Sequence, residues 1–376
     1  MRILFVLDGL FMGGAERNTV QLMRALSKQG HVVHLCTLRP VALDDGAGLS
    51  VGLSDSDHTT LNVRRIYDPR GFRRFLALVA QFKPDVIHVE DPYANVLTLV
   101  AKRVHGVPAV MTRHVAGDTS DVLWDRARLS LLKKSAKAAF DRAILVAEAL
   151  RNDFCAEYAF PTHKVVTIHN GVSIEGYSEN GRRLARAELA WPEHVPIITM
   201  VAVFRAGKGH ATLLDAFRRV LRVTPHAILH FVGDGSLRPE FERQAADLGT
   251  SVAFLGERHD VLLLMRASDA IILPSESEAL PTVLLEAAAV GCPAIASNVG
   301  GTSEIVEHGV TGFLVQARNP EALAAAITEF LHDPALRKRL GRAAHQNAEL
   351  KFSIERQASL TLALYETLLR ERAATG

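Results

Sequence analysis

The sequence predicts an α/β protein built from two doubly wound domains in tandem. Its 376 residues are too many for one ordinary core and enough for two. Short apolar runs of strand length alternate with longer amphipathic stretches, the pattern of a parallel sheet covered by helices. The alternation lapses at the polar segment 173–183 and then restarts. We therefore expect domains at 1–172 and 196–351, joined by a linker at 173–195.

The predicted elements follow one another in a regular order. In the first half, strands and helices are expected at 2–7, 14–29, 31–36, 85–89, 93–104, 108–112, 121–139, 142–146 and 148–158. In the second half they are expected at 197–203, 210–223, 227–232, 236–248, 252–255, 260–267, 270–273, 281–290 and 293–296. A last helical pattern covers 352–376. Because doubly wound folds bind ligands outside the carboxyl ends of their strands, we expect a site in the loops after the strands, in a cleft between the domains.

Composition indicates a globular protein of a reducing compartment. Hydrophobic residues make up 48% and charged residues 22% of the chain, and the net charge of +2 gives no indication of a nucleic-acid partner. Cys36, Cys155 and Cys292 lie far apart and form no C-x-x-C pair, which favours buried thiols. No apolar run reaches the roughly 18 residues of a spanning helix, and the first run, broken by Asp8, is too short for a signal peptide. We expect a cytoplasmic protein.

A glycine-rich turn follows the first predicted strand. Gly9, Gly13 and Gly14 stand between that strand and a helix that begins near Ala15. Glycine there lets the backbone approach a ligand, and the free N–H groups of the helix start suit a phosphate or a sugar hydroxyl. The spacing matches neither a dinucleotide fingerprint nor a P-loop. Glycines needed only for tight packing are an equally good interpretation of this turn by itself.

The most informative stretch is 267–315. An apolar strand ends at Leu273, a polar loop carries Glu278, and a helix is expected to begin near Pro281. Glu286 lies one turn further along, where its carboxylate can accept both hydroxyls of a ribose. A diphosphate would be held at the helix start by the N–H groups of Leu280, Thr282 and Val283.

Glu278 and Glu286, with seven residues between them and "GGTSEIV" following at 300–306, resemble the donor motif of the large retaining family of GT-B glycosyltransferases, glycosyltransferase group 1, family four. The resemblance covers nearly the whole chain. It also includes "GGAERN" (13–18), "NGV" (170–172), "KGH" (208–210), "FVGDG" (231–235) and "FLG" (254–256), in the order and at the spacings of the family. It implies the GT-B fold: two Rossmann-like domains facing a central cleft, the first for the acceptor and the second for the nucleotide sugar, with helix 352–376 packing back on the first.

The resemblance also implies a reaction. It is metal-independent transfer of a hexose-type sugar from a UDP- or GDP-sugar to a glycan or lipid-linked acceptor, with retention of anomeric configuration. No cofactor is implied. His114, Lys208 and Glu278 are the expected catalytic residues: His114 near the reacting carbon, Lys208 on the diphosphate and Glu278 on the sugar hydroxyls. The expected donor-binding set is Gly13, Gly14, Arg205, Lys208, Gly233, Phe254, Leu255, Gly256, Glu278, Leu280, Thr282, Val283 and Glu286.

The sequence departs from the family pattern in three places. Val203 stands where the family usually has a diphosphate-binding arginine, Ala279 replaces a glycine, and Ala147 replaces a common serine. Arg205 would share the face of position 203 if the preceding strand continues that far, because strand side chains alternate. Two alternatives stay open: a GT-B relative such as an epimerase or phosphorylase, and a degenerate member that only binds a sugar nucleotide or a partner.

Two further segments have two interpretations each. Asp55 and Asp57 have the D-x-D spacing of a manganese site, but their context favours a solvated loop, and we expect no metal. The stretch 124–142 carries six basic residues with interleaved leucines. It is either a solvated helix or a peripheral contact with anionic lipid at the inner face of the membrane.

Overall fold

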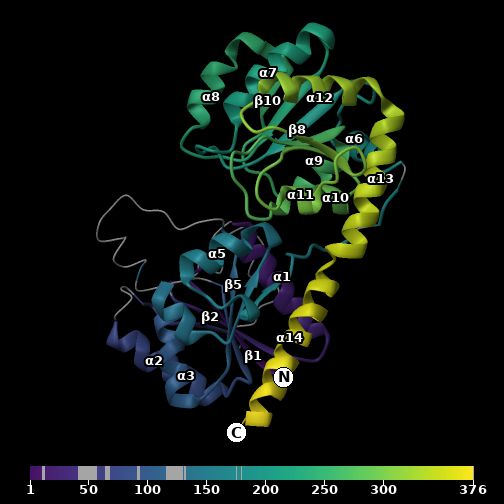
Figure 1. Cartoon of the computed structure of the whole chain (residues 1–376). Coiled ribbons are helices and arrows are strands. Elements are labelled where there is room, and N and C mark those ends of the chain that lie inside the picture. Colours follow the sequence, from purple (N-terminus) through teal and green to yellow (C-terminus); the bar gives the residue numbers. More distant parts are fainter. Residues whose placement is uncertain are drawn as a thin grey trace. The chain divides into compact units, whose positions relative to one another are not determined.

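The computed structural model of the chain describes residues 1–10, 13–40, 57–63, 68–90, 94–115, 130, 133–174, 176–178 and 180–375. The chain divides into two compact units (Figure 1). Unit 1 comprises Met1–Gly171 with Ile354–Gly376, and unit 2 comprises Val172–Ser353. Each unit is built on one parallel sheet, and each is described by itself below.

Unit 1 has a seven-stranded sheet in the order β3-β2-β1-β4-β5-β6-β7, and every neighbouring pair is parallel. Strand β1 (Arg2–Leu7) pairs on both sides, with Ile3 opposite Val33 and Val86. Its apolar residues are fully buried, as expected for a strand covered on both faces. The strands are β1 (Arg2–Leu7), β2 (Val32–Thr37), β3 (His58–Thr60), β4 (Val86–Val89), β5 (Ala109–Arg113), β6 (Arg142–Leu145) and β7 (Val165–Thr167).

The helices of unit 1 include one from the far end of the chain. They are α1 (Gly14–Lys28), α2 (Pro69–Phe82), α3 (Asn95–His105), α5 (Arg151–Tyr158) and α14 (Ile354–Thr375), with short 3-10 turns at Glu148–Leu150 and Thr162–Lys164. Helix α14, yellow in Figure 1, packs along α1. Its Tyr365 and Leu368 are buried in the same core cluster as Phe5. Gln357 exchanges two hydrogen bonds with Asn18, at 3.0 and 2.9 Å.

Unit 2 repeats the plan with a six-stranded sheet in the order β10-β9-β8-β11-β12-β13, again parallel throughout. The strands are β8 (Ile197–Val201), β9 (Ile228–Val232), β10 (Val252–Phe254), β11 (Ala270–Leu273), β12 (Ala294–Ser297) and β13 (Gly312–Val315). The helices are α6 (Gly181–Glu188), α7 (His210–Val223), α8 (Arg238–Gln244), α9 (Val261–Ala267), α10 (Thr282–Ala289), α11 (Thr302–Ile305), α12 (Pro320–His332) and α13 (Pro334–Lys351), with a 3-10 segment at Ala246–Ser251. The two doubly wound α/β sheets predicted from the sequence are confirmed.

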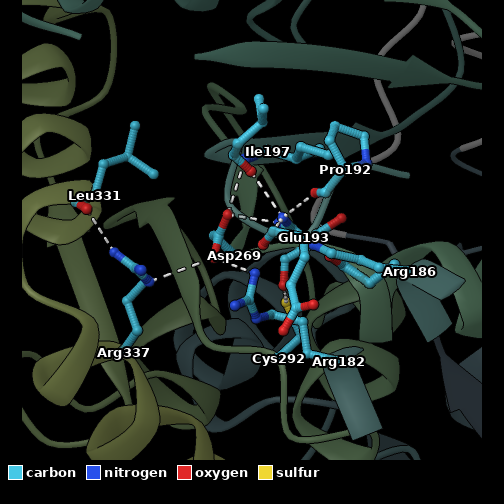
Figure 2. A network of polar contacts seen from close by, with 12 residues as sticks. Arg182, Arg186, Pro192, Glu193, Ile197, Asp269, Cys292, Leu331 and Arg337 are labelled. Atoms are coloured by element: carbon cyan, nitrogen blue, oxygen red, sulfur yellow. Dashed lines mark hydrogen bonds and ion pairs between the residues drawn. The ribbon is translucent and has the colours of Figure 1, made fainter. Parts of the chain in front are cut away.

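The segment 173–195, predicted as a linker, differs from that description because it lies inside unit 2 and contains α6. Figure 2 shows the polar network that fixes it. Arg186 of α6 is 1% exposed and donates to the Asp269 carboxylate at 2.8 Å. Arg182 and Arg337 contact the other oxygen of that carboxylate, at 3.1 and 3.4 Å. Arg186 also donates to the carbonyls of Ala267, Pro192, Glu193 and Val195.

Candidate active site

In unit 2, two predicted site residues meet at the carboxyl edge of the sheet. The strand order reverses between β8 and β11, so the loops after these strands flank the topological switch point. Lys208 follows β8 and Glu278 follows β11, and the Lys208 Nζ donates to Glu278 Oε1 at 2.7 Å. The side chains are 18% and 12% exposed. The residue expected to bind the diphosphate, Lys208, and the residue expected to bind the sugar, Glu278, therefore form an ion pair with each other.

Two positions in the loops around Glu278 require glycine. Gly209 has φ +78°, and a Cβ there would lie 2.1 Å from the carbonyl oxygen of Pro274. Gly300 has φ +51°, and a Cβ there would lie 1.7 Å from the carbonyl oxygen of Glu278. Any side chain at either position would collide with backbone and strain a left-handed conformation. The glycines of "KGH" and "GGTSEIV" thus let neighbouring loops pack against the loop that carries Glu278.

Helix α10 begins directly after this loop, as predicted. Pro281 is the N-terminal capping residue, precedes the first helical residue, Thr282, and makes no side-chain capping bond. The N–H of Leu284 bonds to the Pro281 carbonyl at 3.0 Å. The N–H groups of Thr282 and Val283 come too early in the helix to have intrahelical partners, so they suit an anion. Glu286 lies one turn further along α10 and is half-buried.

The reasoning that gave Arg205 the place of the missing arginine is wrong. Strand β8 ends at Val201, so the alternation of side chains does not reach position 205. The Arg205 N–H bonds to the Val203 carbonyl at 2.9 Å in a tight turn, and both side chains are exposed. Arg205 as a donor ligand stays a prediction, without that argument for it.

The loops after β9 and β10 lie at the same edge and are tied together by their backbones. Gly233 donates to the Gly256 carbonyl and Leu255 donates to the Phe231 carbonyl, each at 2.8 Å. The Phe254 ring stacks on Phe231 with centroids 5.1 Å apart, so this side chain belongs to the aromatic cluster of the core. Contact between this backbone and a nucleotide base remains a prediction.

In unit 1, the glycine-rich turn opens helix α1. Gly13 is its N-terminal capping residue and makes no side-chain capping bond, and Gly14 is its first helical residue. The Glu16 carboxylate lies against the turn at Gly13. A Cβ added to Gly13 would lie 2.2 Å from Glu16 Oε2, so only glycine leaves room for this carboxylate in its present place. Burial raises the pKa of the Glu16 carboxyl above its ordinary value.

His114 lies directly after β5, at the carboxyl edge of the unit 1 sheet, and pairs with a carboxylate that the sequence analysis missed. Its Nε2 is 2.6 Å from Glu90 Oε2, and the side chains are 9% and 5% exposed. Burial alone would raise the pKa of Glu90, but the imidazoles of His88 and His114 and a hydrogen bond from Thr112 outweigh it and hold this pKa below its ordinary value. The available signal was a carboxylate directly after the buried strand 86–89.

Two family models together match most of the chain. One, described as "Glycosyl transferases group 1", matches residues 181–347, and the other, "Glycosyltransferase Family 4", matches residues 12–175. The chain belongs to the group 1, family 4 glycosyltransferases. The resemblance of the donor motif is thereby confirmed at the level of the family.

This glycosyltransferase is similar over its length to characterised relatives. It is 28% identical to a glycogen synthase of Mycobacterium tuberculosis over 97% of this chain and 94% of that protein. It is 26% identical to an N-acetyl-alpha-D-glucosaminyl L-malate synthase of Bacillus anthracis, over 96% and 95%. Among solved structures, HepE of Anabaena in complex with UDP superposes with a TM-score of 0.81 at 22% identity, covering 96% of this chain and 100% of HepE. That likeness confirms the GT-B fold class.

Two expectations for the glycosyltransferase fall largely outside the described residues. Asp55 of the D-x-D spacing lies there, and so do residues 124–129, 131 and 132 of the basic stretch. Within the described part of that stretch, Lys133 pairs with Glu157 and Arg142 with Glu371, each at 2.6 Å. Among the residues that the structure describes, no group of three or more His, Cys, Asp and Glu side chains could hold a metal ion. No helix in the described ranges is long and apolar enough to cross a membrane.

Proposed function

We propose that this glycosyltransferase moves a hexose-type sugar from a UDP- or GDP-sugar to a hydroxyl of a glycan or lipid-linked acceptor, with retention and without a divalent metal. The observation that carries the proposal is the Lys208–Glu278 pair at the switch point of unit 2, with Glu278 in the loop that leads into the start of α10. Structures of HepE hold UDP and UDP-glucose, which supports a nucleotide sugar as the donor.

The chemistry explains why these groups belong together. Breaking the anomeric C–O bond places negative charge on the departing diphosphate, and the site must stabilise that charge. The Lys208 ammonium and the N–H groups of Thr282 and Val283 supply positive potential from the chain itself. In this proposal the diphosphate takes Lys208 from Glu278, which frees the Glu278 carboxylate for the hydroxyls of the sugar.

Glu286 completes the donor site in the proposal. Its place one turn into α10 suits the two hydroxyls of the ribose, while the diphosphate occupies the start of the same helix. Retention would follow from front-face attack, in which the departing phosphate takes the proton of the acceptor hydroxyl. This step needs no base from the chain, and it rests on the resemblance to the family.

A mixed assay tests the proposal against its alternatives. The purified chain is incubated with UDP- and GDP-sugars, with and without candidate acceptors, and the products are resolved by NMR. We expect release of UDP or GDP together with an α-configured product from an α-configured donor. An epimerised donor or a sugar phosphate formed with inorganic phosphate would instead assign an epimerase or a phosphorylase. Binding without any product would assign a binding protein.

A lipid-linked acceptor predicts contact with anionic lipid through the stretch 124–142, of which Lys134 and Lys137 are exposed. Co-sedimentation with vesicles of phosphatidylglycerol should enrich the protein relative to vesicles of phosphatidylcholine. Lys134→Glu with Lys137→Glu should reduce that enrichment. Equal sedimentation with both vesicles would remove the membrane part of the proposal.

A further inference from the structure

The pairing of Glu90 with His114 is shorter and more buried than an ordinary surface contact. Glu90 follows β4 and His114 follows β5, and these strands are neighbours in the sheet of unit 1. The 2.6 Å separation between His114 Nε2 and Glu90 Oε2 is that of a short, charge-assisted hydrogen bond. Since Nε2 carries the proton toward the carboxylate, Nδ1 of a neutral His114 is an acceptor.

The Nδ1 atom of His114 is buried and has no hydrogen-bond partner among the residues that the structure describes. An orphaned polar atom in a side chain that is 9% exposed is costly unless something satisfies it. An acceptor nitrogen is satisfied by a hydroxyl or N–H donor. The hydroxyl groups of a sugar are donors of this kind, so the free nitrogen suits a sugar hydroxyl.

A chain of hydrogen bonds also links Glu90 to Tyr365 through His88 and Thr112. The Tyr365 hydroxyl contacts His88 Nδ1, and His88 Nε2 lies 2.6 Å from the Thr112 hydroxyl. Thr112 in turn hydrogen-bonds the Glu90 carboxylate, and His88 Nε2 lies 3.4 Å from Glu90 Oε1. Burial lowers the pKa of His88, and the neighbouring Glu90 carboxylate opposes that shift. His88 of β4 and Thr112 of β5 thus contact the carboxylate, and Tyr365 of α14 contacts His88.

We propose that Glu90 is a positioning residue for the transfer reaction, which holds the His114 ring so that its Nδ1 accepts a hydroxyl of the acceptor. This inference rests on the proposed function. It assigns Glu90 no contact with substrate. Glu16, the other carboxyl near His114, folds over the turn at Gly13 and makes no hydrogen bond to His114 among those the structure records.

Proton NMR of the full chain tests the pairing without reference to activity. A ring N–H held by a carboxylate at this distance exchanges slowly and resonates far downfield. We expect one such signal in the wild type that His114→Gln removes and Glu90→Gln moves upfield. Glu371→Gln, an exposed glutamate of the same unit, is the control and should leave it in place. Absence of the signal, or a signal that Glu90→Gln does not move, would overturn the inference.

Kinetics test what the pairing does. Glu90→Gln should lower kcat for transfer about 100-fold, the effect of misplacing a reacting group by about 1 Å, while KM for the donor stays nearly unchanged. A variant with normal kcat would overturn the positioning role. If the wild type turns over no donor, the proposed function fails, and the NMR signal still decides whether Glu90 holds His114. If Glu90→Gln does not fold, the wild-type signal and its loss in His114→Gln decide the pairing.

Discussion

Breaking the Lys208–Glu278 pair should have two separable effects, one on stability and one on nucleotide binding. At 2.7 Å, two unit charges attract by about 1.5 kcal/mol in bulk water and by about 6 kcal/mol at an effective permittivity of 20. Because the side chains are only 18% and 12% exposed, desolvation offsets much of the larger value. We expect a net coupling of about 1–3 kcal/mol in the free energy of unfolding.

A double-mutant cycle measures this coupling. Lys208→Met, Glu278→Gln and the double variant are unfolded in urea, and the slope m is compared across the set to check that the same transition is followed. The exposed Arg218–Asp247 pair of unit 2 is the matched control, with an expected coupling below about 1 kcal/mol. A Lys208–Glu278 coupling no larger than that of the control would refute the reasoning.

The same pair makes an unusual prediction for ligand binding. If the diphosphate must take Lys208 from Glu278, then Glu278→Gln removes a competitor for the ammonium. UDP, which lacks the sugar, should bind this variant more tightly, by about tenfold for each 1.4 kcal/mol of coupling. Sugar transfer should nevertheless be lost, because the carboxylate for the sugar hydroxyls is gone. Weaker binding of UDP to Glu278→Gln in calorimetry would contradict the hypothesis that the diphosphate takes Lys208 from Glu278.

Three further predictions follow from packing and burial. Gly300→Ala should lower the melting temperature and abolish transfer, because its Cβ would lie 1.7 Å from the Glu278 carbonyl oxygen; normal melting and activity would show that the loop adapts. Tyr365→Phe should cost about 1–3 kcal/mol in urea unfolding, since it leaves His88 Nδ1 buried without a donor; no loss would mean that this bond stabilises nothing. Burial, with a smaller effect of the Lys208 charge, lowers the pKa of His210 to about 4, so its contribution to stability is complete above its ordinary pKa and is lost as pH falls toward 4. The shift corresponds to a loss of at most about 3 kcal/mol in the free energy of unfolding. The melting temperature of His210→Phe should therefore depend less on pH than that of the wild type between about 7.5 and about 4.5. An unchanged pH dependence would exclude His210 as the cause.

The sequence predicted those parts of the fold that repeat a local pattern. The buried strands β1 and β11 and the start of α10 after Pro281 were found because apolar runs, proline and glycine mark them locally. The edge strands β3 and β7 were missed, although β10, also three residues long, was predicted; β3 reads His-Thr-Thr and has no apolar run to mark it. Helix α6 was taken for a linker because the residue that it buries most fully is Arg186, and a polar sequence hides that burial.

The candidate site was predictable only where a motif marks it. Lys208 and Glu278 were each identified, but their mutual ion pair depends on two loops that meet at the switch point. Glu90 could not be recognised as a site residue from the sequence, because its contact with His114 depends on the pairing of β4 with β5. Arg205 was argued from an alternation that stops where β8 ends, because strand length cannot be read from one apolar run.

Calorimetric titration of the wild type with UDP, GDP and their sugar conjugates tests the central claim most directly. The claim is that the carboxyl edge of unit 2 binds a nucleotide diphosphate sugar. We expect one saturable site for a uridine or guanosine nucleotide, and Glu286→Gln should weaken it by about 1.5–3 kcal/mol, the value of hydrogen bonds to a charged group. Glu321→Gln, an exposed glutamate on α12, should bind like the wild type. No binding of any of these nucleotides, or binding that Glu286→Gln leaves unchanged, would contradict the account.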